Sequence, residues 1–161
     1  MNATGSLVVG VDGSPASAAA LRWAVRQAQL TGGEVCAVTA WSHPLAVDAG
    51  TPGRAIRDVA ETHRRQLEDF LEIARVPGVA IRAEVSEGDP AEVLLSMAQD
   101  AELLVLGSHG HGKMLRALVG SVSAKCLREA RCPVVILPAR VAEGHAGEVL
   151  GALGYQPGPT V

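Results

Sequence analysis

The stretch VLGSHGHGKMLRALVGS, residues 105–121, leaves an apolar run, passes through four glycines and ends where a helix is expected to start. Glycine lets a backbone approach a ligand closely, and the free N–H groups of a helix N-terminus attract anions. A P-loop is almost present, because Gly107 and Gly112-Lys113 fit G-x-x-x-x-G-K, but Met114 stands where that motif needs a Ser or Thr for Mg²⁺. The stretch therefore predicts a phosphate-binding loop of another kind, between a strand and a helix.

Apolar runs on both sides of this stretch alternate with segments of helical period, which is typical of a parallel sheet with crossover helices. Of all residues, 48% are apolar and only 2% are aromatic, which suits strands covered by helices on both faces. Five runs are expected to be strands: 6–11, 34–41, 79–85, 102–106 and 134–137. Right-handed crossovers then predict an α/β, doubly wound five-stranded sheet of order 3-2-1-4-5, with a ligand crevice between the first and fourth strands.

The expected helices have recognisable starts. The pair Ser14-Pro15 supplies an N-cap and a first-turn proline, and residues 56–74 repeat apolar side chains at steps of three and four. The segment 89–92, Asp-Pro-Ala-Glu, has the form of a capping box. The last helix is expected to start after the glycine at 120, with Ser121 as its cap, and to run to about Arg131.

Composition limits the class of protein. A net charge of −3 without any basic run argues against nucleic acid or an anionic membrane as a partner. No membrane span or signal segment is recognisable, so a soluble cytoplasmic protein is expected. Residues 1–138 are expected to form one domain, and the Gly/Ala/Pro-rich segment 139–161 a flexible tail. The three cysteines form no C-x-x-C pair and are expected to be buried free thiols: Cys36, Cys126 and Cys132.

A spacing motif links the two ends of the opening stretch. Gly107 and Gly110 are two residues apart, and nine more residues lead to Gly120-Ser121. This G-2x-G-9x-G-S/T pattern resembles the motif of the ATP-binding universal stress proteins, and VVGVDGS and CPVVILP at the first and last strands are also similar to that family. The resemblance covers roughly residues 5–138. It implies a three-layer sandwich of the flavodoxin-like or adenine nucleotide alpha hydrolase-like type.

The resemblance also implies a binding site. Glycines and the hydroxyl of the motif would contact phosphates, and the ends of the first two strands would border the adenosine. The expected site residues are Val11, Asp12, Ala40, Trp41, Gly107, His109, Gly110, Gly120, Ser121 and Val122. Two roles stay open for Asp12. It either serves the ligand, by bonding the adenosine or helping to organise a metal, or it braces the turn into the first helix. Trp41 either lies against the base or packs at the end of its strand.

The expected function is regulatory ATP binding in a stress response. No paired carboxylates and no Ser/His/Asp set are in reach of the phosphates, so at most slow hydrolysis or autophosphorylation is expected. His109 and His111 lack a third ligand for zinc, whereas Mg²⁺ or Mn²⁺ held mainly by phosphates fits better, and the site of any metal is left open. AMP or another adenine nucleotide is an alternative ligand, and a P-loop-like NTPase or kinase, or an interaction module with an empty cleft, is an alternative function. A homodimer through the edge strand 134–137 is expected.

Overall fold

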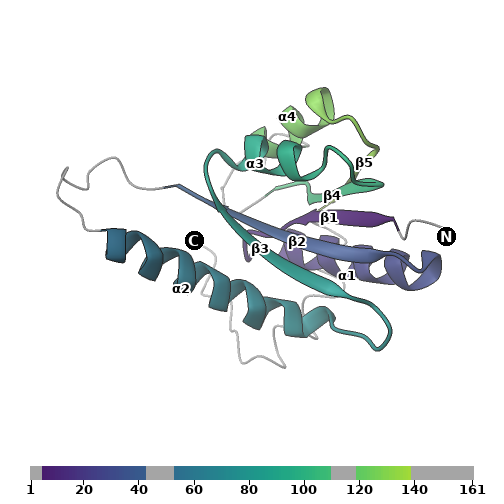
Figure 1. The fold of residues 1–161 in the computed structure, drawn as a ribbon. Helices are drawn as coiled ribbons and strands as arrows, with labels where there is room; N and C mark the ends of the chain where they lie inside the picture. The colour runs from purple at the N-terminus through teal and green to yellow at the C-terminus, as the bar shows by residue number, and fades with distance from the viewer. Residues whose placement is uncertain (1–4, 43–52, 110–118, 139–161) are drawn as a thin grey trace, which may run out of the picture.

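The computed structural model describes residues 5–42, 53–109 and 119–138. They form one parallel sheet of order β3-β2-β1-β4-β5, as predicted, with the short last strand at one edge (Figure 1). The strands are β1 Ser6–Gly10, β2 Glu34–Trp41, β3 Ile81–Glu87, β4 Leu103–Gly107 and β5 Val134–Leu137. The third strand starts two residues later than expected, after a turn in which Gly78 has φ +85°.

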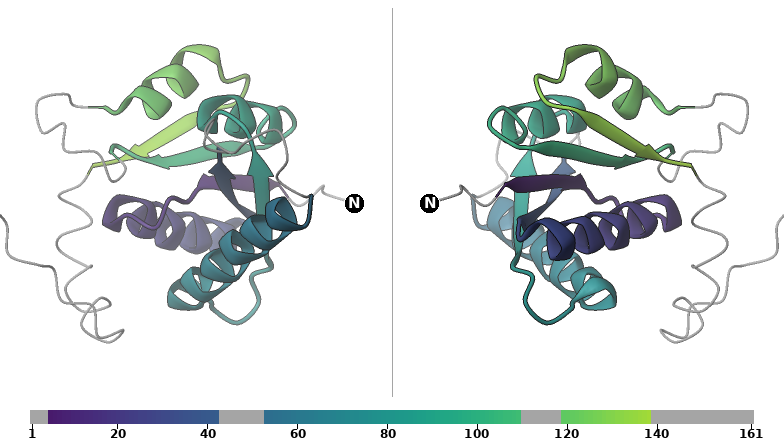
Figure 2. Two further views of the ribbon diagram at one scale, coloured as in Figure 1. Left: turned by 90° about the vertical axis from the view of Figure 1, so that its left-hand side faces the viewer. Right: turned by 90° about the vertical axis from the view of Figure 1, so that its right-hand side faces the viewer.

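Helices cover both faces of the sheet, so the domain has three layers (Figure 2). One face carries α1 Pro15–Thr31 and α2 Gly53–Leu71, which continues into the short 3-10 helix η1 Glu72–Ala74, and the other carries α3 Pro90–Met97 and α4 Ser121–Glu129. Side chains alternate along each strand, so Val9 packs with α1 and Val8 with α3. Two apolar cores therefore lie above and below the strands. None of the described helices is long and apolar enough to cross a bilayer.

Local capping explains where two of the helices start. The Ser14 Oγ accepts a hydrogen bond of 3.2 Å from the Ser17 N–H and caps α1, as predicted. The Asp89 Oδ1 accepts from the N–H groups of Ala91 and Glu92, both at 3.1 Å, and caps α3. The predicted capping box is wrong in its second half, because the Glu92 carboxylate hydrogen-bonds Lys125 of α4.

The start of α4 differs from the prediction. Gly120 is the N-cap residue, with extended backbone angles of φ −70° and ψ 166°, and Ser121 is the first helical residue. The reason is tertiary, because the Gly120 N–H donates to the Ser108 carbonyl at 2.6 Å, while the Gly120 carbonyl accepts from Ala124 at 2.8 Å. This helix ends at Glu129, two residues before the expected end. The segment 139–161 lies outside the described residues.

Candidate functional site

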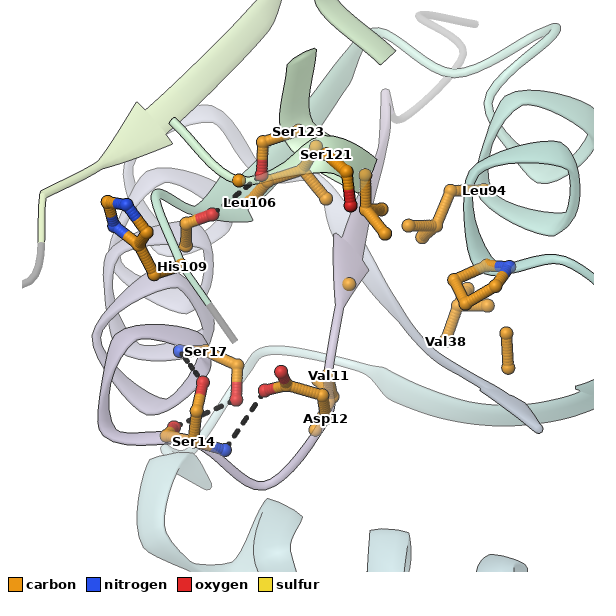
Figure 3. A pocket seen from close by; sticks show the side chains of 16 residues that line it. Val11, Asp12, Ser14, Ser17, Val38, Leu94, Leu106, His109, Ser121 and Ser123 are labelled. Atoms are coloured by element: carbon orange, nitrogen blue, oxygen red, sulfur yellow. Dashed lines mark hydrogen bonds between the residues drawn. The ribbon is translucent and has the colours of Figure 1, made fainter. Parts of the chain in front are cut away.

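A pocket of about 340 Å³ opens at the carboxyl ends of β1 and β4, where the strand order reverses (Figure 3). This is the position at which doubly wound α/β folds bind ligands. Its lining residues are Gly10, Val11, Asp12, Ser14, Ser17, Val38, Ala40, Pro90, Leu94, Leu106, Gly107, His109, Gly120, Ser121, Val122 and Ser123. The described part of the predicted site is thus brought together, with the exception of Trp41.

The pocket has two chemically different sides. Figure 3 shows Asp12 and Ser121 on one side of the pocket and Val38 and Leu94 on the other. The apolar side is completed by Leu106, which is buried in the core between the sheet and α3. Such an arrangement suits a ligand with one flat apolar part and one polar part.

The N-terminus of α4 supplies unpaired donors to the polar side. The first N–H groups of a helix have no partner within the helix, and a side chain at the N-cap position normally accepts from one of them. Ser14 and Asp89 do this for α1 and α3, whereas Gly120 has no side chain and α4 has no side-chain cap. The backbone at Ser121 and Val122 therefore presents N–H groups and the positive end of the helix dipole at the pocket wall.

Two hydrogen bonds join the ends of the glycine-rich loop. The Gly120 N–H donates to the Ser108 carbonyl, and the Ser123 Oγ donates to the Gly107 carbonyl at 2.8 Å. Residues separated by a long loop in the sequence are thereby held next to each other, which places the start of α4 directly beside the end of β4. Gly110, His111, Lys113 and Arg116, which lie in that loop, are outside the described residues.

Two glycines of the pocket lack a side chain for different physical reasons. A Cβ on Gly107 would lie 2.8 Å from the Ala16 Cβ and 2.9 Å from the Ala16 carbonyl carbon, so this glycine is required by the packing of α1 on β4. A Cβ on Gly10 would instead meet the side-chain ends of Leu106 and Leu94, at 2.7 and 3.3 Å, both of which line the pocket. The absence of a side chain at Gly10 therefore keeps the pocket open.

Asp12 braces the turn after β1. Its Oδ1 accepts a hydrogen bond of 3.0 Å from the Ser14 N–H, which is the Asx turn that the sequence left as one of two alternatives. The carboxylate is nevertheless exposed and lies in the pocket lining. The turn-bracing role and a place in the pocket lining are therefore compatible.

Trp41, which the sequence predicted at the site, is not among the residues that line this pocket. The side chain is only 7% exposed, and its indole ring stacks on the imidazole of His63 in α2, with ring centroids 5.9 Å apart and planes 22° apart. This packing against α2 is the second of the two roles that the sequence left open. It also gives His63 a structural role.

His109 contributes to the rim of the pocket, and its ring points away from Val38 and Leu94 in Figure 3. Its Nδ1 lies 3.1 Å from the Oγ of Ser108, which is buried. Within residues 5–42, 53–109 and 119–138, no group of three or more His, Cys, Asp or Glu side chains is placed to hold a metal ion.

The cysteines are free thiols, as predicted. Cys36 and Cys126 are buried, and Cys132 is half-buried rather than buried. Burial raises the pKa of all three thiols above the ordinary value of 9.0. They are therefore protonated near neutral pH, and none of them lines the pocket.

Some lining residues were missed by the sequence argument. Val38 was overlooked although it points to the same side of β2 as Ala40, two residues later. Pro90 and Leu94 come from α3, whose N-cap signal placed a helix start near the carboxyl ends of the strands. The other missed residues are Gly10, Ser14, Ser17, Leu106 and Ser123. Several of these residues would have been predicted if the periodicity of the helices and strands had been followed by one more position from the expected site residues.

The fold and the site define a doubly wound α/β domain with a two-sided pocket at its switch point. The chain belongs to the universal stress protein family, which it matches over residues 4–138.

Relatives of known sequence or structure share most of this domain. Universal stress protein Rv2623 of Mycobacterium tuberculosis is 33% identical over 143 residues, which cover 84% of this chain and 48% of that protein. The chain spans about half the length of the curated relatives that it matches. Universal stress protein UspA from Lactobacillus plantarum has a TM-score of 0.65 at 26% identity, covering 83% of this chain and 97% of that one. A universal stress protein solved in complex with cAMP has a TM-score of 0.59 at 27% identity, covering 85% and 98%.

Proposed function

We propose that this chain binds an adenine nucleotide, ATP among them, in the pocket between β1 and β4, and that it acts as a regulatory protein in a cytoplasmic stress response. The observation that carries the proposal is the N-terminus of α4, which has no side-chain cap and forms a wall of that pocket. Phosphates are the ligands that such a helix start favours. The relative solved in complex with cAMP supports an adenine nucleotide as the ligand.

The two sides of the pocket suggest how the nucleotide lies. The base would pack on the apolar side, against Val38 and Leu94, and the phosphates would accept hydrogen bonds from the first turn of α4 near Ser121. Among the described lining residues Asp12 is the one carboxylate. Mg²⁺ or Mn²⁺ would therefore be held mainly by the phosphates and water, because these ions prefer several oxygen ligands.

A binding role is favoured over a catalytic one. Turnover needs a base placed at the attacking group, and the described lining offers only Asp12, which is engaged in its turn, and His109, which contacts Ser108. Slow hydrolysis or autophosphorylation is compatible with this arrangement.

The first test identifies the ligand directly. Mass spectrometry of small molecules released from the purified, denatured protein is expected to find an adenine nucleotide. Added ATP and Mg²⁺ should also raise the melting temperature, because a ligand at about 100 times its Kd stabilises the native state by about 2.7 kcal/mol. No released nucleotide and no thermal shift would together contradict the proposal.

A variant pair connects binding to this pocket. Gly10→Val places an isopropyl group against Leu106 and Leu94 inside the pocket, so we expect ATP binding to be lost while the fold is kept. Ala80→Val introduces the same side chain at an exposed position before β3 and should bind as the wild type does. Isothermal titration and circular dichroism measure the two properties. Equal affinity of both variants would place the ligand elsewhere.

The proposal includes a homodimer through β5. Among the described residues this strand pairs only with β4. The carbonyl of Pro133, just before the strand, accepts a hydrogen bond from Leu104 of β4, and the carbonyl of Leu137 accepts one from Ser108. Because backbone groups alternate along a strand, those of Val134 and Ile136 point to the open edge. An edge with unpaired backbone groups is a ready template for a second copy of the strand.

A further inference from the structure

Two helix starts meet across the pocket. Helices α3 and α4 pack together on the same face of the sheet (Figure 1), and the first turn of each lines the pocket. Pro90 and Leu94 of α3 belong to the apolar side, and Gly120 and Ser121 of α4 to the polar side. The distance between these helices therefore decides how far the two sides of the pocket are apart.

One ammonium group joins these two helix starts. Lys125 lies four residues after Ser121 and therefore one turn further along α4. Its Nζ hydrogen-bonds the Glu92 carboxylate and lies 3.8 Å from the Asp89 Oδ1. Asp89 is the N-cap residue of α3 and Glu92 is in its first turn. We call this group of three side chains the α3–α4 clasp.

The clasp differs from the other ion pairs of the described residues. Those pairs join residues two to four positions apart in the sequence, whereas the clasp connects residues 33 positions apart. The Lys125 side chain is 30% exposed, less than that of any other cation in these pairs. The pKa of Lys125 is raised, first by the hydrogen bond to Glu92, with smaller effects of Asp89 and Glu129, so the charge is present throughout the physiological range.

We propose that Lys125 is a positioning residue that holds the starts of α3 and α4 at the separation which the nucleotide needs. The inference rests on the proposed function. The pocket must contact the phosphates at the start of α4 and the nucleobase against α3 at the same time. A separation of the two helices that is already set before binding therefore lowers the free-energy cost of ordering the pocket. Lys125 would touch neither part of the ligand and would act only through Glu92 and Asp89.

Four variants test this role by ATP affinity. Lys125→Met keeps much of the aliphatic length but removes the clasp, and Glu92→Gln removes the carboxylate charge that pairs with Lys125. Both are expected to raise the Kd for ATP by roughly two- to five-fold, in line with partly exposed ion pairs. The double variant should be no worse than Lys125→Met, because both changes break one interaction. Lys125→Arg, which keeps the charge, is expected to retain most of the affinity.

Changes of opposite sign in the Kd for ATP of Lys125→Met and Glu92→Gln would overturn the inference. If Lys125 attracted phosphates by its charge alone, Glu92→Gln would free that charge and lower the Kd for ATP, whereas Lys125→Met would raise it. An unchanged Kd in Lys125→Met would overturn the inference as well, with the proposed function left intact. A wild-type chain that binds no nucleotide would instead contradict the proposed function and, with it, any role of Lys125 in affinity.

A second measurement needs no ligand. In the free protein, hydrogen exchange reports the first hydrogen bonds of the two helices, from Ala124 N–H to the Gly120 carbonyl and from Val93 N–H to the Asp89 carbonyl. Lys125→Met should speed exchange at both amides and leave the amide of Val9, in the central strand, unchanged. Unchanged exchange at Ala124 and Val93 would show that the clasp does not hold the helix starts, whatever the nucleotide affinity.

Discussion

Gly107 shows that one residue can belong to a ligand motif for a reason unrelated to the ligand. In the sequence it is the first glycine of a phosphate-binding pattern. In the structure its Cα hydrogen faces the backbone of Ala16, and a Cβ there would stand 2.9 Å from the Ala16 carbonyl carbon. The close packing of α1 on β4, and thus the position of the pocket wall, depends on this glycine.

The packing argument predicts a loss of stability in Gly107→Ala. Overpacking against backbone typically costs about 1–3 kcal/mol, because the helix backbone cannot move aside as the end of a side chain can. We expect the free energy of unfolding to fall by about this amount. Urea unfolding without nucleotide measures it. Gly120→Ala is the comparison, since its Cβ would meet no atom closer than 3.3 Å, and it should lose less. Equal losses in the two variants would contradict the assignment.

At the scale of the elements, the helices of the domain start in two different ways. Helices α1 and α3 are capped by their own local sequence, through Ser14 and Asp89, and both starts were predicted from the sequence. Helix α4 starts at a residue that has no side chain and is held by the Ser108 carbonyl. A helix start that leaves its donors unpaired at a pocket is the element on which the proposed nucleotide binding rests.

This difference predicts unequal effects of two Ser→Ala changes on the stability of the free protein. Ser14→Ala removes a cap and should lower the free energy of unfolding by about 1 kcal/mol. Ser121→Ala should change it little, because Ser121 is exposed and accepts no capping bond. Chemical denaturation of both variants without nucleotide checks the pair. A loss in Ser121→Ala as large as that in Ser14→Ala would mean that Ser121 is the cap after all.

At the scale of the whole molecule, the open edge of the sheet concerns assembly. Strand β5 has β4 on one side, and the backbone of Val134 and Ile136 faces away from it. The opposite edge of the sheet is β3, which carries the charged pair Arg82 and Glu84. Charged side chains protect an edge from pairing, so the apolar β5 edge is the better candidate for contact with a second copy.

Sedimentation velocity tests the proposed dimer. We expect the wild type to sediment as a dimer and Val134→Pro to sediment as a monomer, because proline removes an N–H that points to the open edge. Val134→Thr keeps that N–H and the branched shape, and should remain dimeric. A wild type that stays monomeric at high concentration would contradict the dimer, and a dimeric Val134→Pro would move the contact away from this strand.

The sequence by itself determined the layers, the strand order and the starts of α1 and α3. These features follow from short-range causes: runs of apolar residues that must be covered on both faces, right-handed crossovers, and side chains such as Ser14 and Asp89 that bond to their own neighbours. The glycine motif also directed attention to the carboxyl ends of the strands, where the pocket lies.

Only the tertiary structure decided how the pocket is built. Trp41 was free in the sequence to face a ligand or the core, and the His63 ring on a distant helix settled this choice. The cap of α4 moved from Ser121 to Gly120 because the Ser108 carbonyl lies beside it, and Glu92 turned from its own helix to Lys125. Each of these outcomes depends on a partner that is remote in the sequence, and the energies that favour a local or a remote partner are too similar for local pattern alone to separate.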